Sequence, residues 1–418
     1  MPSRRPRALG ALAALVALFT AGYLAPYLLP TVVGRLSTGL GLGPAQAGLI
    51  GSILLLGSAS AGFTLAARAD RIGPRRAARL GLALMVLGYG TAAATDLVPL
   101  VVAGAVTGGF GSGTATAVAA AAIAGRPDPH RASALGLLSV SATAGALYVT
   151  LPRLGGGHGL PLAAIAGTAV LVVPTTVWLP DGRPRPTGHG PGPGRQVRGP
   201  LPHRGAGTAL AGSILLWSLA QNALWGVSGR IGLTQAGLSE ATLGLVFAVA
   251  LAAGLVGVIG AGALGSRLGR AVPIGAGTAL IAGCVLLSSA AQDAASFATG
   301  EIAWNAVYPV VLSYLLGLAA SLDPHGRWAV LVGSASSLGV ACGPVTGSLL
   351  SEAAGYRGMG LTLCALLLLA AAPMTTIARR PLIPGTPEQP IAPVDIRATS
   401  PLRPPSRSSF RLARPGRG

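Results

Sequence analysis

One acidic residue lies within a long apolar segment of the sequence. Glu301, Asn305 and Tyr308 are spaced i, i+4 and i+7, which places them on one face of a helix, with Trp304 beside them. A charged side chain in the middle of a membrane costs on the order of 2.5 to 3.5 kcal/mol, so a retained one is a candidate for function. We predict that Glu301 binds and releases a proton and that this proton transfer is coupled to the function of the protein. The alternative is that it reaches external water, because it lies near the expected outer end of its helix.

Two other apolar segments carry polar and aromatic faces at helical spacing. Trp217, Gln221 and Trp225 share one face, with Asn222 at its side. Thr20, Tyr23 and Tyr27 share another, and Pro26 and Pro30 can kink that helix. Such faces either line a binding cavity or supply interfacial aromatics and helix–helix hydrogen bonds.

Other kinds of chemistry find little support in the sequence. The three cysteines, Cys284, Cys342 and Cys364, lie in apolar segments without C-x-x-C spacing, so we expect neither a disulfide nor a metal site. We find no H-E-x-x-H, no G-x-S-x-G and no paired intramembrane carboxylates, which argues against a membrane enzyme. A channel filter or charged ring is also missing. We expect no cofactor.

The composition indicates a membrane protein. The 418 residues are 51% hydrophobic and only 10% charged, with a mean hydropathy of +0.64. The net charge of +19 would suit nucleic-acid binding, but all 30 basic residues are arginines in loops and tails between apolar runs rather than in one patch. We therefore expect a lipid bilayer, and no nucleic acid, as the partner.

Twelve apolar segments are long enough to span a bilayer, because a spanning helix needs about 20 residues. We expect them at 8–33, 45–67, 76–95, 97–124, 132–153, 160–179, 208–229, 242–264, 271–291, 296–318, 327–350 and 358–378. Counted on alternate sides, 26 arginines fall on one side and four on the other. Basic short loops stay cytoplasmic, so both termini are predicted to be cytoplasmic. The segment after SRRPR also resembles a signal peptide, but it is too long for one.

The two halves of the chain repeat each other at an interval of about 195 residues. Arg35 pairs with Arg230, and the tripeptide beginning at Asp128 recurs at Asp323. We predict an all-α membrane protein with twelve helices in two pseudo-symmetric bundles: 1–179 and 208–378. Between them lies a Pro/Gly/Arg-rich cytoplasmic linker, 180–207, and a disordered cytoplasmic tail follows at 379–418.

The loop between the second and third segments reads GFTLAARADRIGPRRAARL, and its counterpart in the second half reads GALGSRLGR. Both resemble the signature loop of the major facilitator superfamily. In that family the motif lies in these same two loops. In the second copy Ser266 stands where Asp70 stands. Gly73 permits a tight turn, and basic neighbours can hold that turn on the anionic face of the membrane.

The resemblance implies a conformational latch at these loops and a central cavity lined by the first, fourth, seventh and tenth segments. The latch residues would be Asp70, Arg71, Gly73, Arg75, Arg76, Arg267 and Gly269. The substrate-binding residues would be Tyr23, Tyr27, Gln221, Asn222, Trp225, Trp304, Asn305 and Tyr308. The alternative to a latch is a turn whose arginines serve only to orient the chain in the membrane. The fourth-segment arginine of many proton-coupled members is absent, because Gly104 stands at that position.

We therefore expect a monomeric secondary transporter in the cytoplasmic membrane, and not an enzyme. It would move a small organic molecule, neutral or weakly polar, by alternating access, with protons as partners and efflux as the direction. Uptake or uniport of a small metabolite is the alternative, and a channel or membrane enzyme is a remote one.

Overall fold

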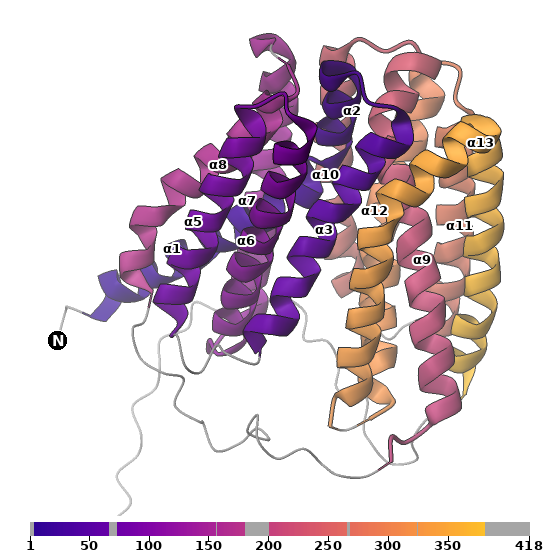
Figure 1. The fold of residues 1–418 in the computed structure, drawn as a ribbon. Coiled ribbons are helices and arrows are strands. Elements are labelled where there is room, and N and C mark those ends of the chain that lie inside the picture. Colours follow the sequence, from indigo (N-terminus) through magenta and orange to yellow (C-terminus); the bar gives the residue numbers. More distant parts are fainter. Residues whose placement is uncertain are drawn as a thin grey trace, which may run out of the picture.

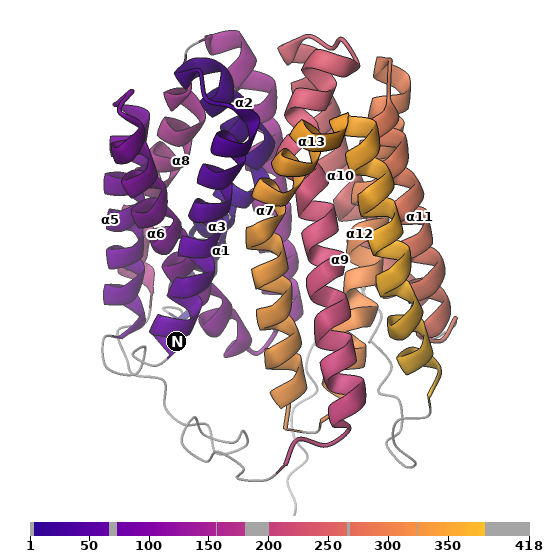
Figure 2. The same ribbon diagram turned by 45° about the vertical axis from the view of Figure 1, so that its right-hand side comes forward.

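The structure is a computed structural model that describes residues 4–66, 73–155, 157–179, 200–265, 268–323 and 325–380. Within these ranges the chain is helical and contains no strand. The helices run roughly parallel to one another in two groups that lie side by side (Figures 1 and 2). Asp70, Arg71, Ser266 and Arg267 lie outside the described residues, as do most of the expected linker and tail.

The first half of the chain forms one group of helices. Its α-helices are α1 (Arg4–Tyr27), α2 (Leu29–Leu40), α3 (Pro44–Ala66), α5 (Pro74–Ala93), α6 (Val98–Ala124), α7 (Pro129–Thr150) and α8 (Gly159–Val172). Two short 3₁₀ helices, η1 (Leu151–Leu154) and η2 (Val173–Trp178), extend α7 and α8. The colours from indigo to magenta in Figure 1 mark this group.

The second half forms the other group. Its helices are α9 (Arg204–Arg230), η3 (Ile231–Gln235), α10 (Glu240–Leu264), α11 (Ala271–Ala290), α12 (Ala294–Ser321) and α13 (Arg327–Arg379). Among the described residues, ten helices are long and apolar enough to cross a membrane. One of these, the 53-residue α13, is bent and holds two of the expected segments, and α5 supplies one more. The protein is thus an all-α membrane protein with twelve spanning segments in two bundles.

The first segment is longer than the sequence predicts. We expected it to end near residue 33, but helix continues through α2 to Leu40, with an interruption at Leu28. Pro26 and Pro30 explain the interruption, because each lacks an N–H and cannot donate to the carbonyl four residues earlier. The expected end was wrong because Arg35 suggested a loop, whereas its side chain is buried.

The last two expected segments correspond to the two helical arms of α13, which a bend separates. The bend falls at Gly355, whose φ of 70° and ψ of 173° are not helical. Only glycine adopts this backbone conformation without strain. The expected loop at 351–357 is therefore a single turning residue between two helical arms.

Glycines allow the helices of the first half to approach closely. A Cβ built on Gly113 in α6 would lie 2.0 Å from the carbonyl oxygen of Ser58 in α3. One built on Gly88 in α5 would lie 2.2 Å from the amide nitrogen of Gly108. These distances leave no room for a side chain, so van der Waals contact between backbones holds α3, α5 and α6 together.

The two halves contact each other through α3 and α13, α7 and α10, and α2 and α9. In α3 the contacts involve Gly48 and Ser52, which lie in the half of the helix nearest its N-terminus. The Oγ of Ser52 accepts a 3.0 Å hydrogen bond from the amide of Val345. Figure 2 shows the helices of the two halves meeting at the end where α2 and the bend of α13 lie.

Candidate functional site

The carboxyl group of Glu301 is enclosed by three helices of the second half. It lies in α12, and none of its surface is exposed to solvent. The hydroxyl of Ser228 in α9 donates a 2.8 Å hydrogen bond to its Oε1. Ser288 of α11 borders the same site, because its Oγ would lie 2.3 Å from a Cβ built on Gly300. Glu301 therefore does not reach external water in this conformation.

Two buried polar atoms face each other at this site. Oε2 of Glu301 and the Oγ of Ser288 form no hydrogen bond of good geometry, but the Ser288 hydroxyl lies close enough to the carboxyl group to donate to it. A buried carboxylate is costly unless donors, a cation or a proton compensate it. The second oxygen of Glu301 thus offers an acceptor for a proton in a site that excludes water.

Aromatic and amide side chains of α9 and α12 form one cluster beside Glu301. The indole N–H of Trp304 donates a 2.8 Å hydrogen bond to Oε1 of Gln221. The Gln221 Nε2 in turn donates to the backbone carbonyl of Trp217 at 3.1 Å. The rings of Trp217 and Tyr308 stack with their centroids 5.2 Å apart, and those of Trp225 and Trp304 are 5.7 Å apart. The predicted residues of the two helices therefore meet.

The two asparagines at the cluster each bond to their own helix. Asn222 Nδ2 donates to the Ser218 carbonyl at 2.9 Å, and Asn305 Nδ2 donates to the Glu301 carbonyl at 3.0 Å. Both side chains are partly buried. Each amide uses one N–H in this way, and its oxygen can still accept a hydrogen bond.

Tyrosines of α1 border the cluster from the first half of the chain. Tyr23 and Tyr27 are partly buried, and Trp225 of the cluster donates a 3.1 Å hydrogen bond to the carbonyl of Pro26, the residue before Tyr27. Tyr23 also packs against Phe19, with ring centroids 4.5 Å apart. The backbone carbonyl of Tyr27 accepts a 2.6 Å hydrogen bond from the hydroxyl of Tyr148 in α7. All eight predicted substrate-binding residues thus lie on three helices, α1, α9 and α12.

The sequence analysis missed several members of this site. Ser228 and Ser288 border Glu301, while Tyr148 and Phe247 pack against each other with ring centroids 5.0 Å apart. Ser228 follows Gln221 by seven residues, so helical spacing could have placed it on the same face. Ser288 could not be found in this way, because its position depends on how α11 packs against α12.

The described residues of the expected latch lie at the ends of helices. Gly73 has a φ of 79° and precedes α5, and Gly269 has a φ of 62°. Arg75 donates from Nε to the carbonyl of Thr176 at 3.0 Å and also contacts the carbonyl of Val177. Arg75 therefore ties α5 to η2 within the first half, while Arg76 is exposed.

An ion pair joins the two halves at the end opposite these arginines. Arg35 of α2 lies 3.0 Å from Glu240 at the start of α10. Arg35 also donates to the backbone carbonyls of Gly155 and Leu151 at 2.9 and 3.3 Å. Nearby, Oε1 of Glu352 accepts a 2.9 Å hydrogen bond from the amide of Ala45 at the start of α3. Neither interaction was predicted from the sequence.

Within the described part of the chain, no group of three His, Cys, Asp or Glu side chains could hold a metal ion. The site therefore consists of one buried carboxyl group, two serines and a cluster of aromatic and amide side chains. Such an arrangement can bind an organic molecule through stacking and hydrogen bonds, and it can hold a proton.

Several solved structures share the fold. The human organic anion transporter MFSD10 (TETRAN) is 18% identical, with a TM-score of 0.63, 90% of this chain covered and 100% of that chain. A bacterial homolog of the human lysosomal transporter Spinster, in an inward-facing and unoccupied conformation, is 16% identical, with a TM-score of 0.64 and coverage of 90% and 95%. The nucleoside transporter NupG is 11% identical, with a TM-score of 0.69 and coverage of 88% and 99%.

No curated protein matches the sequence. The model of the Major Facilitator Superfamily, however, matches residues 8–324, which is most of the chain and includes helices of both halves. Together with the two helical bundles, this match shows that the chain belongs to the Major Facilitator Superfamily and is a membrane transporter.

Proposed function

We propose that this transporter exports a small organic molecule across the cytoplasmic membrane and that a proton moving in the opposite direction drives the export. The observation that carries the proposal is the buried carboxyl group of Glu301 beside the aromatic cluster. A group that must exchange a proton without admitting water needs such an enclosed position.

Coupling between proton transfer and substrate binding follows from the proximity of the Glu301 carboxyl group to the aromatic cluster. Asn305, which bonds to the backbone carbonyl of Glu301, lies one turn further along α12. Trp304 connects the same helix to Gln221 of α9. A change in the charge of Glu301 therefore acts on a short, hydrogen-bonded stretch that also contacts the substrate.

The substrate-binding residues favour a neutral or weakly polar compound. Tyr308 and Trp304 offer ring faces and edges, while Gln221 and Asn305 offer amide groups. The described part of the cluster contains no arginine and no carboxyl group other than Glu301. A substrate with several charges would therefore lack partners in this site.

Alternating access would proceed by rocking of the two bundles about this midplane site. The ion pair between Arg35 and Glu240 would hold one end closed. The loops that contain Asp70 and Arg267 would act as the latch at the other end. Because 26 of the 30 arginines lie on the side of these loops, we assign that side to the cytoplasm.

Uptake or uniport of a small metabolite is the second candidate, because either also fits the fold. Everted membrane vesicles distinguish the two directions. Export predicts that an imposed proton gradient, acidic inside, drives accumulation of substrate in the everted vesicle. Accumulation in right-side-out vesicles under an inward proton gradient would instead establish uptake, and vesicles without the protein provide the control.

The substrate for this experiment comes from a thermal stabilisation screen of metabolites and drugs. A compound that binds only the folded protein raises its unfolding temperature by mass action. The compound with the largest effect is then the one to test in vesicles.

A further inference from the structure

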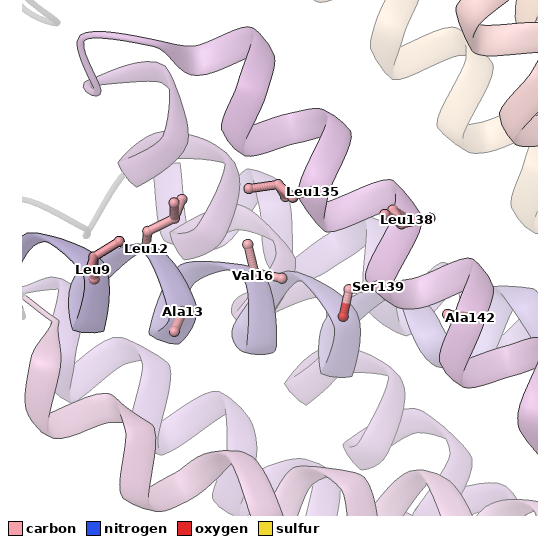
Figure 3. Close-up of a pocket in the computed structure, with 8 residues that line it drawn as sticks. All are labelled: Leu9, Leu12, Ala13, Val16, Leu135, Leu138, Ser139 and Ala142. Carbon is pink, nitrogen blue, oxygen red and sulfur yellow. The ribbon is translucent and has the colours of Figure 1, made fainter. Parts of the chain in front are cut away.

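A charged group with unsatisfied hydrogen-bonding capacity lies at the interface between the two halves. The groove between α1 and α7 holds no such group, because its described lining is apolar except for Ser139 (Figure 3). The Ser139 hydroxyl already accepts a 2.8 Å hydrogen bond from Thr20. The group at the interface is the guanidinium of Arg230, at the end of α9.

The Arg230 side chain is enclosed but has few partners. Only 9% of the residue is exposed. Its Nη2 donates a 3.2 Å hydrogen bond to the Oγ of Ser348 in α13, and its Nε is buried without a partner. No carboxylate of the described residues forms an ion pair with it. A buried guanidinium is costly unless acceptors or a negative charge compensate it.

Ser348 adds a second donor that lacks an acceptor. The residue is fully buried, and its Oγ accepts the hydrogen bond from Arg230. Its own hydroxyl hydrogen finds no acceptor among the described residues. The same Oγ lies against the first half, because it would be 2.3 Å from a Cβ built on Gly48 of α3. An N–H and an O–H donor therefore lie side by side between the halves, and neither has an acceptor.

The repeat-related arginine of the first half has the negative partner that Arg230 lacks. Arg35 pairs at 3.0 Å with the carboxylate of Glu240, the first residue of α10. It also donates to two backbone carbonyls. The two arginines occupy equivalent places in the repeat, but only one of them is compensated.

The missing carboxylate can be traced to one position. Gly48 of α3 and Gly244 of α10 each lie four residues after the start of their helix. A Cβ built on these glycines would lie 2.7 and 2.1 Å from a backbone carbonyl oxygen of the other half, so the two helix starts are equivalent in structure. The first residue of α3 is Pro44, which stands where Glu240 stands in α10.

We propose that the Nε of Arg230 and the hydroxyl of Ser348 bind a small monovalent anion, such as chloride. The anion supplies the negative charge that Glu240 supplies to Arg35. Because Nη2 of Arg230 is bonded to Ser348, the guanidinium does not offer both N–H groups of that edge to a flat carboxylate. One N–H and one O–H suit a spherical acceptor.

Glu352 is the alternative source of negative charge. It lies one turn after Ser348 on α13, and its side chain is exposed. Its Oε1 accepts a 2.9 Å hydrogen bond from the amide of Ala45 at the start of α3. In this conformation Glu352 therefore compensates the start of α3, and it forms no ion pair with Arg230.

Equilibrium unfolding in mixed micelles tests the assignment, with sodium gluconate replaced by sodium chloride at constant ionic strength and pH. An anion that binds only the folded protein raises the ratio of folded to unfolded protein by up to about tenfold for each tenfold increase in its concentration. We expect this response in the unaltered protein and less than a twofold change in Arg230→Gln. Arg153→Gln, which removes an exposed arginine of η1, should respond like the unaltered protein.

A carboxylate built into the chain should replace the anion. Pro44→Glu places one at the position equivalent to Glu240, and an acidic residue suits the first turn of a helix. The stability of this variant should depend on chloride less than twofold. Pro44→Gln, which adds the same side chain without the charge, should keep the chloride response.

Three results would overturn the proposal: no chloride response in the unaltered protein, a response that survives Arg230→Gln, or equal responses in Pro44→Glu and Pro44→Gln. A response that arises only in Glu352→Gln would likewise overturn it and would show that Glu352 compensates Arg230. The measurement requires no transport. Absence of proton-driven flux in vesicles would therefore contradict the proposed function and leave the anion site standing.

Discussion

The indole N–H of Trp225 donates a 3.1 Å hydrogen bond to the backbone carbonyl of Pro26, and this bond joins α9 to α1 across the boundary between the two halves. The carbonyl is available because Pro30, four residues later, has no N–H to donate to it. A proline in one half thus creates an acceptor that an indole of the other half satisfies.

We predict that Trp225→Phe lowers the free energy of unfolding by about 1 to 3 kcal/mol, because it leaves the Pro26 carbonyl without its partner. Unfolding in mixed micelles measures the change. Trp178→Phe is the matched control, because the Trp178 side chain is 53% exposed. Equal losses in both variants would show that ring size, and not the hydrogen bond, matters.

The two partners of the ion pair, Arg35 and Glu240, should contribute unequally to the free energy of unfolding. The Glu240 side chain is 55% exposed, so Glu240→Gln should cost only about 0.2 to 1 kcal/mol. Arg35→Ala should cost about 2 to 3 kcal/mol, because it also removes the donors to Gly155 and Leu151.

The same variants should change how readily a labelling reagent reaches the interface between the two halves near this ion pair. Ser52→Cys, in a background without the native cysteines, places a thiol where Ser52 accepts from Val345 between the halves. Arg35→Ala should speed labelling of that thiol more than Glu240→Gln does. Identical labelling rates in both variants would contradict a closing role for Arg35.

Much of the fold could be predicted from the sequence because bilayer thickness fixes the length of an apolar helix. The start of α10 at Glu240 and the end of α6 at Ala124 lie within two residues of the expected positions. The end of the first segment could not be predicted, since burial of Arg35 depends on Glu240, more than 200 residues away. Ion pairs across helices leave no periodic signal.

The candidate site, like the fold, could be predicted only in part from the sequence. Helical spacing placed Gln221 with Trp225 and Glu301 with Asn305, because these pairs lie on single helices. The hydrogen bond from Trp304 to Gln221 and the one from Thr20 to Ser139 depend on packing between helices. Spacing along one helix carries no information on such packing.

Close packing of α6 against α3 should make one glycine intolerant of substitution. Gly113→Ala places a methyl group 2.0 Å from the Ser58 carbonyl oxygen, so the helices must separate. We expect a loss of about 1 to 3 kcal/mol in unfolding free energy. Gly167→Ala, where no atom lies within 4 Å, should be neutral or stabilising by up to about 1 kcal/mol. A loss of the same size at both positions would refute the packing argument.

The loop between α12 and α13 should make stability depend on acidic pH. Desolvation raises the pKa of Asp323, but hydrogen bonds from Arg327 and His325 outweigh it and bring the pKa to about 2. Arg327 Nε lies 2.8 Å from the carboxylate. Because the folded pKa is below the unfolded value of about 3.9, the contribution is complete above pH 4 and is lost as the pH falls toward 2.

We therefore expect Asp323→Asn to lower the free energy of unfolding by about 1 to 2 kcal/mol at neutral pH and to flatten its decline below pH 4. Asp128→Asn is the control at the repeat-related position. Asp128 accepts a 3.0 Å bond from the Arg131 amide at the start of α7, a role that asparagine also fills. An unchanged acid profile in Asp323→Asn would contradict this assignment.

The assignment of the coupling proton to Glu301 is tested most directly in proteoliposomes under an imposed pH gradient. The purified protein is given the compound selected by the thermal screen, and net flux and equilibrium exchange are measured separately. Glu301→Gln should abolish gradient-driven flux and preserve exchange, because glutamine keeps the shape of the side chain but carries no exchangeable charge. Glu352→Gln, a carboxyl group at the closed end, should keep both activities. Flux that still follows the pH gradient in Glu301→Gln would contradict the account.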